Sequence, residues 1–219
     1  MDVKNYRENE IKWFILAYMF LLTGIKRPDM IFVTNTDLLS KIESILSSTL
    51  LAGVICTLSF VFDCLYTTKF KEILLFLGFT KMPGKTVFTR ISNGRLKDIR
   101  FETDKAQKHY KHIAKEIPSD KEKRCAFENE QWYLLFSKYK DDNMIKSSHR
   151  DFLLSRDLYV TTITLTVLTV IAMTFRIIQL NWIPIGYLTL MLILTNLSAH
   201  FKAHRFINNV IAVDLRNVI

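Results

Sequence analysis

The chain has 219 residues, of which 49% are hydrophobic and 23% are charged, and its formal net charge at pH 7 is +9. A mean hydropathy of +0.14 with this many charges excludes both a transporter buried almost wholly in lipid and an ordinary soluble domain. The values are typical of membrane helices joined to a sizeable aqueous part. Six glycines and four prolines supply few helix breakers, so we expect a mainly α protein.

Two apolar segments lie in the N-terminal third. Residues 13–25 are uncharged, but they make only about 20 Å of helix, which in isolation suits an interfacial or signal-peptide-like segment. No small-residue cleavage site follows, and Lys12 and Lys26 could snorkel towards the headgroups. We therefore predict a short first span. Residues 44–62 contain no charge and predict a second span, because about 20 residues cross the hydrocarbon core.

A longer apolar segment follows near the C-terminus. Residues 158–199 carry one charge, Arg176, and are long enough for two spans. A turn signal lies between them, since Trp182 suits the membrane interface and Pro184 suits the first turn of a helix. We predict a helical hairpin of residues 158–178 and 184–201, which gives about four transmembrane helices in a polytopic protein.

The segment between the two membrane regions is basic. Residues 69–157 contain 20 lysines and arginines and 13 aspartates and glutamates. The positive-inside rule then places this segment and both termini in the cytoplasm of a bacterial inner membrane. The predicted organisation is a membrane helical pair (1–68), a basic cytosolic domain (69–157), a membrane hairpin (158–201) and a cytosolic tail (202–219).

The basic domain shows short helical patterns and one strand-like pattern. A helix continuous with the second span should extend from residue 69 to Gly78. Residues 86–91 and 95–101 alternate partly and flank an Asn-Gly pair, which predicts a small β-hairpin. Apolar spacing predicts helices over 103–117 and 119–139, and a third that begins near Asn143 and continues into the membrane. The expected insert is thus α with a small β element.

Enzymatic motifs are weak throughout the chain. Residues 78–86 resemble a phosphate-binding loop, but five residues separate the glycines where that loop has four, and no strand is predicted before it. The pairs His109 with His112 and His200 with His204 could each share a helix face, yet neither has an acidic or cysteine partner nearby. The three cysteines have no metal-site or disulfide spacing. We predict no enzymatic activity, no cofactor and no bound metal.

Small and hydroxyl residues recur at intervals of three or four in two predicted spans. Such stripes allow close helix packing, either within the four-helix unit, at a seam between subunits of a homo-oligomer such as a tetramer, or along a pore. One charge, Asp63, is too little to indicate an ion pathway, so the seam is favoured over the pore; Lys69 or Arg156 could neutralise it. The stripe residues are Ser48, Ala52, Cys56, Ser59, Thr162, Thr166 and Thr169.

Two groups of basic residues suggest contacts outside the chain. The first group lies on one face of the predicted 103–117 helix and is either a solvated face or a docking surface for an acidic partner protein or nucleic acid, with direct nucleic-acid binding the less favoured. Its members are Lys105, Lys108, Lys111 and Lys115. The second group, Lys81, Lys85 and Arg90, lies close to the predicted bilayer, where it could attract anionic lipid headgroups.

Three segments carry a resemblance to known proteins: MPGKTVFT at 82–89, NEQWYLLF at 129–136 and HRDFLLSRD at 149–157. With the following hairpin, they resemble a group of uncharacterised bacterial four-helix membrane proteins. The size, topology and Lys/Ile/Asn-rich composition are also similar to those of the membrane subunits of the Kiwa antiphage defence system. That resemblance implies a homo-oligomer in the inner membrane, a cytosolic DNA-binding partner protein, and no enzymatic role.

The sequence thus predicts an inner-membrane sensor or scaffold that oligomerises and recruits a cytosolic partner, in antiphage defence. The alternative is a membrane-permeabilising, pore-forming effector of a defence or toxin system, with the threonine face lining a channel.

Overall fold

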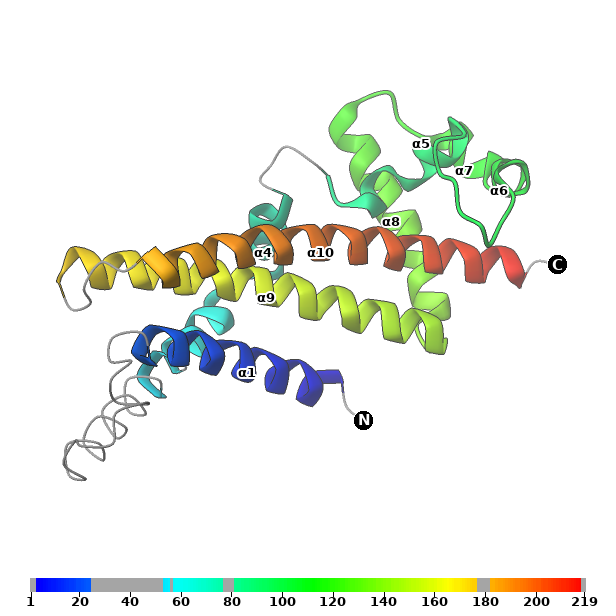
Figure 1. Cartoon of the computed structure of the whole chain (residues 1–219). Coiled ribbons are helices and arrows are strands. Elements are labelled where there is room, and N and C mark those ends of the chain that lie inside the picture. The colour runs from blue at the N-terminus through cyan, green and yellow to red at the C-terminus, as the bar shows by residue number, and fades with distance from the viewer. Residues whose placement is uncertain (1–2, 25–52, 56, 77–80, 177–181, 218–219) are drawn as a thin grey trace, which may run out of the picture. The chain divides into compact units, whose positions relative to one another are not determined.

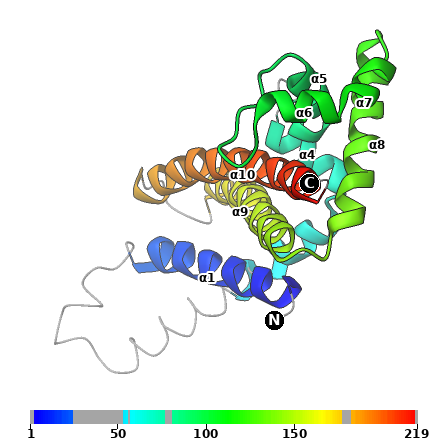
Figure 2. The ribbon, with the colours of Figure 1, turned by 90° about the vertical axis from the view of Figure 1, so that its right-hand side faces the viewer.

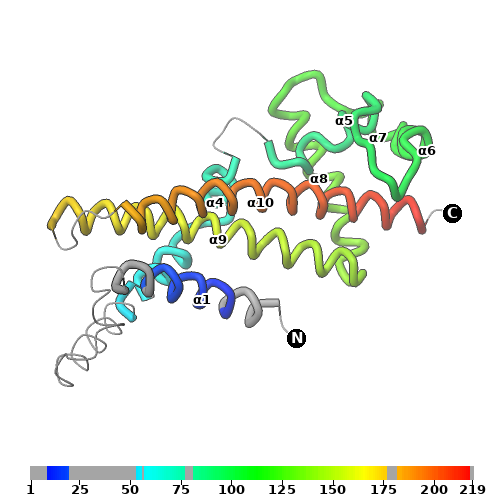
Figure 3. Tube along the Cα trace, in the orientation of Figure 1, coloured from blue at the N-terminus to red at the C-terminus, as the bar shows by residue number. Residues whose placement is uncertain are grey.

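The computed structural model describes residues 3–24, 53–55, 57–76, 81–176 and 182–217 (Figures 1 and 3). These residues are mostly helical and contain no strand; a single isolated bridge joins Asp98 and Phe101. The predicted mainly α class is confirmed. The chain forms two compact units: unit 1 contains Met1–Lys71 and Leu154–Asn196, and unit 2 contains Glu72–Leu153 and Leu197–Ile219.

Unit 1 is built around α1 (Val3–Gly24) and parts of the long helices α9 (Asn143–Thr174) and α10 (Trp182–Arg216). Its core contains Ile15, Tyr18, Met19, Leu165 and Leu188. Large apolar side chains on α9 and α10 are exposed, as expected for helices that face lipid. They are Val167, Val170, Ile171, Leu190, Ile193 and Leu194.

Two of the described helices, α9 and α10, are long and apolar enough to cross a membrane. A third candidate is a bent pair, Gly53–Leu65 with α4 (Thr68–Phe76). The prediction of four spans is therefore not supported. Residues 13–24 form the second half of α1, but the charges in its first half shorten the apolar stretch. About half of the predicted second span, residues 44–52 and residue 56, lies outside the described residues.

The helix expected to continue unbroken from the second span to Gly78 is interrupted. The segments before and after Tyr66 and Thr67 differ in direction by 100°. Thr67 begins the second segment, because its hydroxyl oxygen accepts a hydrogen bond from the Phe70 N–H at 3.2 Å. A new helix start at Thr67 thus replaces the predicted continuous helix.

Unit 2 packs short helices around the last turns of α10. These helices are η1 (Pro83–Thr86), α5 (Val87–Ser92), α6 (Thr103–His109), α7 (Lys111–Glu116) and α8 (Lys121–Tyr139). Figure 2 shows α5 to α8 beside the end of α10. Every apolar residue of α10 from Ala203 to Leu215 is buried. Residues 203–215, which belong to the predicted C-terminal tail (202–219), therefore supply core side chains to unit 2, because their apolar side chains need a covered surface.

The predicted β-hairpin is wrong, and its first strand is α5. Val87, Phe88 and Ile91 are buried on one side of this short helix. The Asn-Gly pair ends the helix: Gly94 has a φ of +65°, its N–H donates to the Ile91 carbonyl at 3.0 Å, and the Arg95 N–H donates to the Arg90 carbonyl at 2.8 Å. This is a Schellman cap, which requires the same left-handed residue as a hairpin turn.

The helix expected over 103–117 is divided at Tyr110, where the backbone leaves helical geometry between α6 and α7. The phenol ring of Tyr110 is buried edge-on against Phe88. The helix expected over 119–139 is α8, and its cap is Asp120, whose carboxylate accepts from two backbone N–H groups. The predicted start of α9 at Asn143 and its uninterrupted course into the apolar segment are confirmed.

Gly84, the second glycine of the segment that resembles a phosphate-binding loop, allows close packing. Gly84 lies in η1, and a Cβ there would stand 3.4 Å from both Ile207 Cδ1 and the Trp132 ring. Lys85 Nζ lies 3.5 Å from the Glu72 carboxylate. The described structure therefore places a 3₁₀ turn where a nucleotide-binding protein would need a loop opening onto a long helix.

We expect Gly84→Val to destabilise unit 2 by about 1–3 kcal/mol, because the valine methyls extend beyond a Cβ that already touches both neighbours. Thermal melting of the detergent-purified protein measures the loss. Lys85→Ala is the matched control, since its ion pair is partly exposed and should contribute little. Equal melting temperatures for Gly84→Val and wild type would contradict the close packing.

Candidate functional site

A buried carboxylate near the end of α10 positions the basic surface of unit 2. Asp214 accepts hydrogen bonds from the Tyr110 hydroxyl at 2.7 Å and the Tyr139 hydroxyl at 2.9 Å. His109 Nε2 lies 3.1 Å from Asp214 Oδ2, the oxygen that also accepts from Tyr110. Burial, followed by the hydrogen bond to Asp214, raises the pKa of Tyr110 well above its usual range. This network fixes the α6–α7 junction and the end of α8 to α10.

A second polar cluster holds the segment before α6. Asp98 accepts from Arg100 Nε at 2.7 Å and Nη2 at 2.6 Å, and from Asn208 Nδ2 at 3.1 Å. The remaining Arg100 nitrogen, Nη1, donates to the side-chain oxygen of Asn209. The hydrogen bond from Arg100 is the main cause that lowers the pKa of Asp98, and the same bond raises the pKa of the guanidinium. The Arg100 side chain is thereby held in one orientation.

Between these clusters lies a hollow of about 550 Å³, which we call the α6–α10 groove. Basic side chains, apolar side chains and one carboxylate contribute to its walls. The lining residues are Ile99, Arg100, Phe101, Glu102, Lys105, Lys108, His109, Ala212, Leu215 and Arg216.

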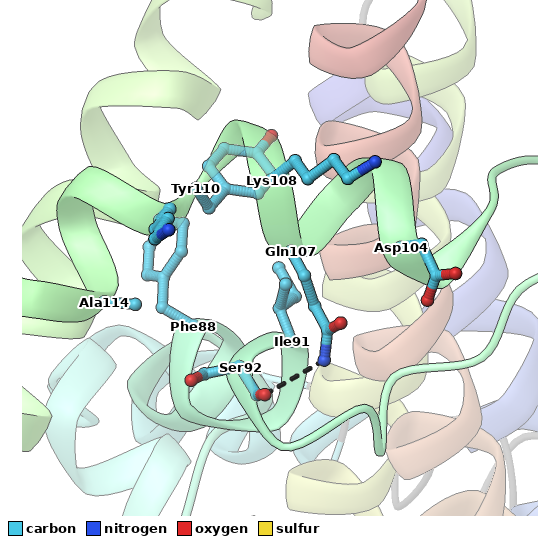
Figure 4. Close-up of a pocket in the computed structure, with 9 residues that line it drawn as sticks. Phe88, Ile91, Ser92, Asp104, Gln107, Lys108, Tyr110 and Ala114 are labelled. Carbon is cyan, nitrogen blue, oxygen red and sulfur yellow. Dashed lines mark hydrogen bonds between the residues drawn. The ribbon is translucent and has the colours of Figure 1, made fainter.

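A second hollow of about 390 Å³, the α5–α6 pocket, lies on the other side of Lys108. Phe88 and Ile91 of α5 form one wall, and α6 and α7 form the other (Figure 4). Gln107 reaches across to α5, and its Nε2 donates to the Ser92 carbonyl at 3.0 Å.

The four lysines predicted to share one helix face are divided between these hollows. Lys105 and Lys108 line the α6–α10 groove, Lys108 and Lys111 line the α5–α6 pocket, and Lys115 lines neither. The break at Tyr110 explains the division, because α7 does not continue the face of α6. Lys105 forms an exposed pair with Glu102 at 3.2 Å, which contributes little to stability.

The residues predicted to meet lipid headgroups have partners within unit 2. Lys81 Nζ lies 2.7 Å from Cys125 Sγ, and Lys85 pairs with Glu72. Arg90 Nη1 lies 3.3 Å from His204 Nδ1. Burial lowers the pKa of Arg90, and burial followed by the charge of Arg90 lowers the pKa of His204. Lys81 is the exposed member of this group.

The predicted seam is only partly within the described residues, since Ser48, Ala52 and Cys56 lie outside them. Ser59 is buried. Each predicted threonine donates its hydroxyl to the carbonyl four residues earlier in α9, at 2.7 Å for Thr162, 2.8 Å for Thr166 and 2.7 Å for Thr169. The Thr169 hydroxyl also lies 2.5 Å from that of Tyr18 in α1, so it packs within unit 1.

Unit 1 contains a buried charge cluster that the sequence revealed only in part. Lys71 Nζ lies 2.5 Å from Asp63 Oδ1 and 3.4 Å from Asp157 Oδ1, and Arg156 Nη2 lies 2.9 Å from the same Asp157 oxygen. Lys71, rather than the expected Lys69 or Arg156, pairs with Asp63, and Arg156 pairs with Asp157. The new helix start at Thr67 determines which lysine faces inward. The sequence did contain one indication that Asp157 is buried in a charge cluster: it is an acidic residue at the apolar edge of a predicted span.

No group of three metal-ligating side chains gathers among the residues that the structure describes. Of the predicted histidine pairs, His109 contacts Asp214, and the ring of His200 lies edge-on against Phe76.

Comparison with protein-family models, curated proteins and solved structures gives no match for this chain. The fold defines its class: a helical protein in which two helices of the described residues are long and apolar enough to cross a membrane, together with a charged unit of short helices.

Proposed function

We propose that this protein is an inner-membrane scaffold that recruits a cytosolic partner protein through the basic surface formed by α6 and α7. The observation that carries the proposal is the position of Lys108. It lies between two hollows and lines both, and no ion pair to it occurs within the described part of the chain. An uncompensated cation between two concave surfaces favours an acidic partner and speeds its encounter.

Charge pairing of the two arginines that line the α6–α10 groove favours a protein partner over nucleic acid there. Arg100 is bonded to Asp98, and Arg216 Nη2 lies 3.2 Å from Asp142. Nucleic-acid binding depends on many lysines and arginines that can replace condensed counterions. Cations already bonded to carboxylates are poorly suited to that role, whereas a few acidic side chains of a protein need only a few free cations.

The biological setting and the assembly belong to the same proposal. The resemblance in size, topology and Lys/Ile/Asn-rich composition to the membrane subunits of the Kiwa antiphage defence system supports a role in antiphage defence, with a homo-oligomer in the inner membrane and cytosolic termini. The pore-forming alternative has less support, because the threonines assigned to a channel donate to carbonyls of their own helix. A threonine hydroxyl with that bond can still accept a hydrogen bond from water in a pore. The experiment below therefore also measures ion leakage.

We expect reversal of Lys105, Lys108 and Lys111 to Glu to reduce partner recovery from membranes at least tenfold, because each reversal places like charges at the contact. The experiment is an affinity pull-down of the tagged protein at low and physiological salt, quantified by mass spectrometry. The loss should be larger at low salt, where screening is weaker.

A control triple variant reverses the exposed lysines Lys97, Lys121 and Lys123, which line neither hollow, and changes the net charge equally. Equal partner recovery from both triple variants would reject docking on the basic surface. If the wild type recovers no partner and its expression depolarises cells, the pore-forming function replaces the scaffold.

A further inference from the structure

The α6–α10 groove has both a basic wall and an apolar wall, and a surface that binds by charge alone would not need the apolar one. Basic side chains form one part. Ile99, Phe101, Ala212 and Leu215 form the other. Ile99 is fully exposed, with a relative accessibility of 104%, although it lies beside Arg100, whose side chain is bonded to Asp98 and Asn209. An isoleucine held on a fixed segment and left uncovered is suited to contact an apolar group of a ligand.

The position of Ile99 is determined by bonds on both sides of it. The Asp98 carboxylate accepts from the Arg100 backbone N–H at 3.1 Å as well as from its side chain. Asn208 and Asn209 on α10 bond to Asp98 and Arg100 respectively. Ile99 is therefore presented on a segment that is bonded to the helix forming the groove floor, and a ligand would not have to order it first.

The net positive charge of the groove lining is small, because most of its basic side chains form ion pairs with carboxylates. Arg100 is compensated by Asp98, Lys105 by Glu102 and Arg216 by Asp142, while His109 contacts Asp214. Lys108 is the groove lysine without an ion pair among the described residues. The groove thus offers about one uncompensated positive charge beside an apolar wall, which suits one or two carboxylates next to an apolar side chain better than a polyphosphate.

We infer that the α6–α10 groove binds a short acidic peptide segment of the partner, with an apolar side chain packed on Ile99 and Leu215 and a neighbouring carboxylate on Lys108. This inference rests on the proposed scaffold function and names the part of the partner that is recognised. The volume of about 550 Å³ lies within the range of pockets that enclose small ligands, so it holds one large side chain with its neighbours.

The test uses the full-length protein in phosphatidylcholine nanodiscs, which add no net lipid charge. Three fluorescein-labelled probes are compared by anisotropy: a pentapeptide of four glutamates around a central phenylalanine, a pentaglutamate, and a single-stranded oligothymidylate of similar charge. The wild type should bind the phenylalanine peptide roughly tenfold more tightly than pentaglutamate, as expected for burial of much of one large apolar side chain.

Variants separate the apolar wall from the charge. Ile99→Ala should remove most of the preference for the phenylalanine peptide and leave pentaglutamate binding unchanged, because Ile99 is exposed and its replacement does not disturb the core. Lys108→Ala should weaken both peptides several-fold. Lys115→Ala, which changes an exposed lysine outside both hollows, should change neither.

Four results would overturn the inference: no binding of the phenylalanine peptide to wild type, equal preference in wild type and Ile99→Ala, tighter binding of the oligothymidylate than of either peptide, or an equal loss in Lys108→Ala and Lys115→Ala. The pull-down is independent of these probes. If the lysine triple reversal abolishes partner recovery while Ile99→Ala binds every probe like wild type, the scaffold function stands and the groove assignment fails.

Discussion

Asp157→Asn should lower the stability of the protein by about 3–5 kcal/mol, which is a large part of the stability of an ordinary domain. The Asp157 side chain is completely buried and lies beside both Lys71 and Arg156. Removing its charge takes from Arg156 the carboxylate with which it pairs among the described residues and leaves Lys71 paired with Asp63, and a buried unpaired charge is costly. Purification yield and thermal melting in mild detergent would measure the loss.

The matched control is Asp151→Asn, the same chemical change in the same helix. Asp151 pairs with Arg150 at 3.2 Å and Lys202 at 2.9 Å, but its side chain is 29% exposed, so we expect a loss of about 1 kcal/mol or less. The coupling within the buried cluster is tested by adding Lys71→Met to Asp157→Asn. The double variant should lose less than the sum of the two single variants. Strict additivity would show that the cluster does not act as one unit.

Asp214→Ala should have the second largest effect, a loss of about 3 kcal/mol or more in unit 2. The substitution removes the acceptor of the buried Tyr110 hydroxyl, whose loss costs about 1–3 kcal/mol, and the partner of the part-buried Tyr139 hydroxyl and His109 Nε2. Because these donors belong to α6, α8 and their junctions, we also expect the variant to lose peptide binding in the α6–α10 groove. Chemical denaturation followed by tryptophan fluorescence reports the loss, since Trp132 is buried in unit 2.

Tyr110→Phe is the control for this network. It removes one donor and leaves Asp214 bonded to Tyr139, so the expected loss is about 1 kcal/mol. It also carries a pH signature. The folded state raises the pKa of Tyr110, so its stabilising contribution is complete below about pH 10, the unfolded value, and decreases as the pH rises above it. Wild type should therefore lose stability at alkaline pH more steeply than Tyr110→Phe, and identical slopes would contradict the burial of this hydroxyl.

Local patterns predicted several elements correctly. Apolar length and the scarcity of charges indicated the two long helices α9 and α10, and the absence of a breaker after Asn143 indicated that α9 continues into the apolar segment. Helix spacing indicated α8 as far as Tyr139. In each case a run of neighbouring residues contains the physical cause, because helix hydrogen bonds and burial of one face join residues a few positions apart.

The erroneous β-hairpin shows why one local signal was insufficient. Val87, Phe88 and Ile91 can be interpreted as part of an alternating strand or as the buried side of a short helix. The Asn-Gly pair suits either a hairpin turn or a Schellman cap, since both need a left-handed residue. Tertiary packing in unit 2 stabilises the helix, because the Thr89 N–H and hydroxyl both donate hydrogen bonds to the buried Glu128 carboxylate of α8.

The basic character of the chain's middle and its pair of long apolar helices follow from the sequence alone, because charge and hydropathy are properties of each residue. The charge and lining of the α6–α10 groove do not follow from the sequence alone. Tyr110 interrupts the predicted lysine face through a bond to Asp214, 104 positions away, and Lys71 meets Asp157 across 86 positions. Which lysine stays uncompensated, and which carboxylate becomes buried, depends on partners that only tertiary packing brings together.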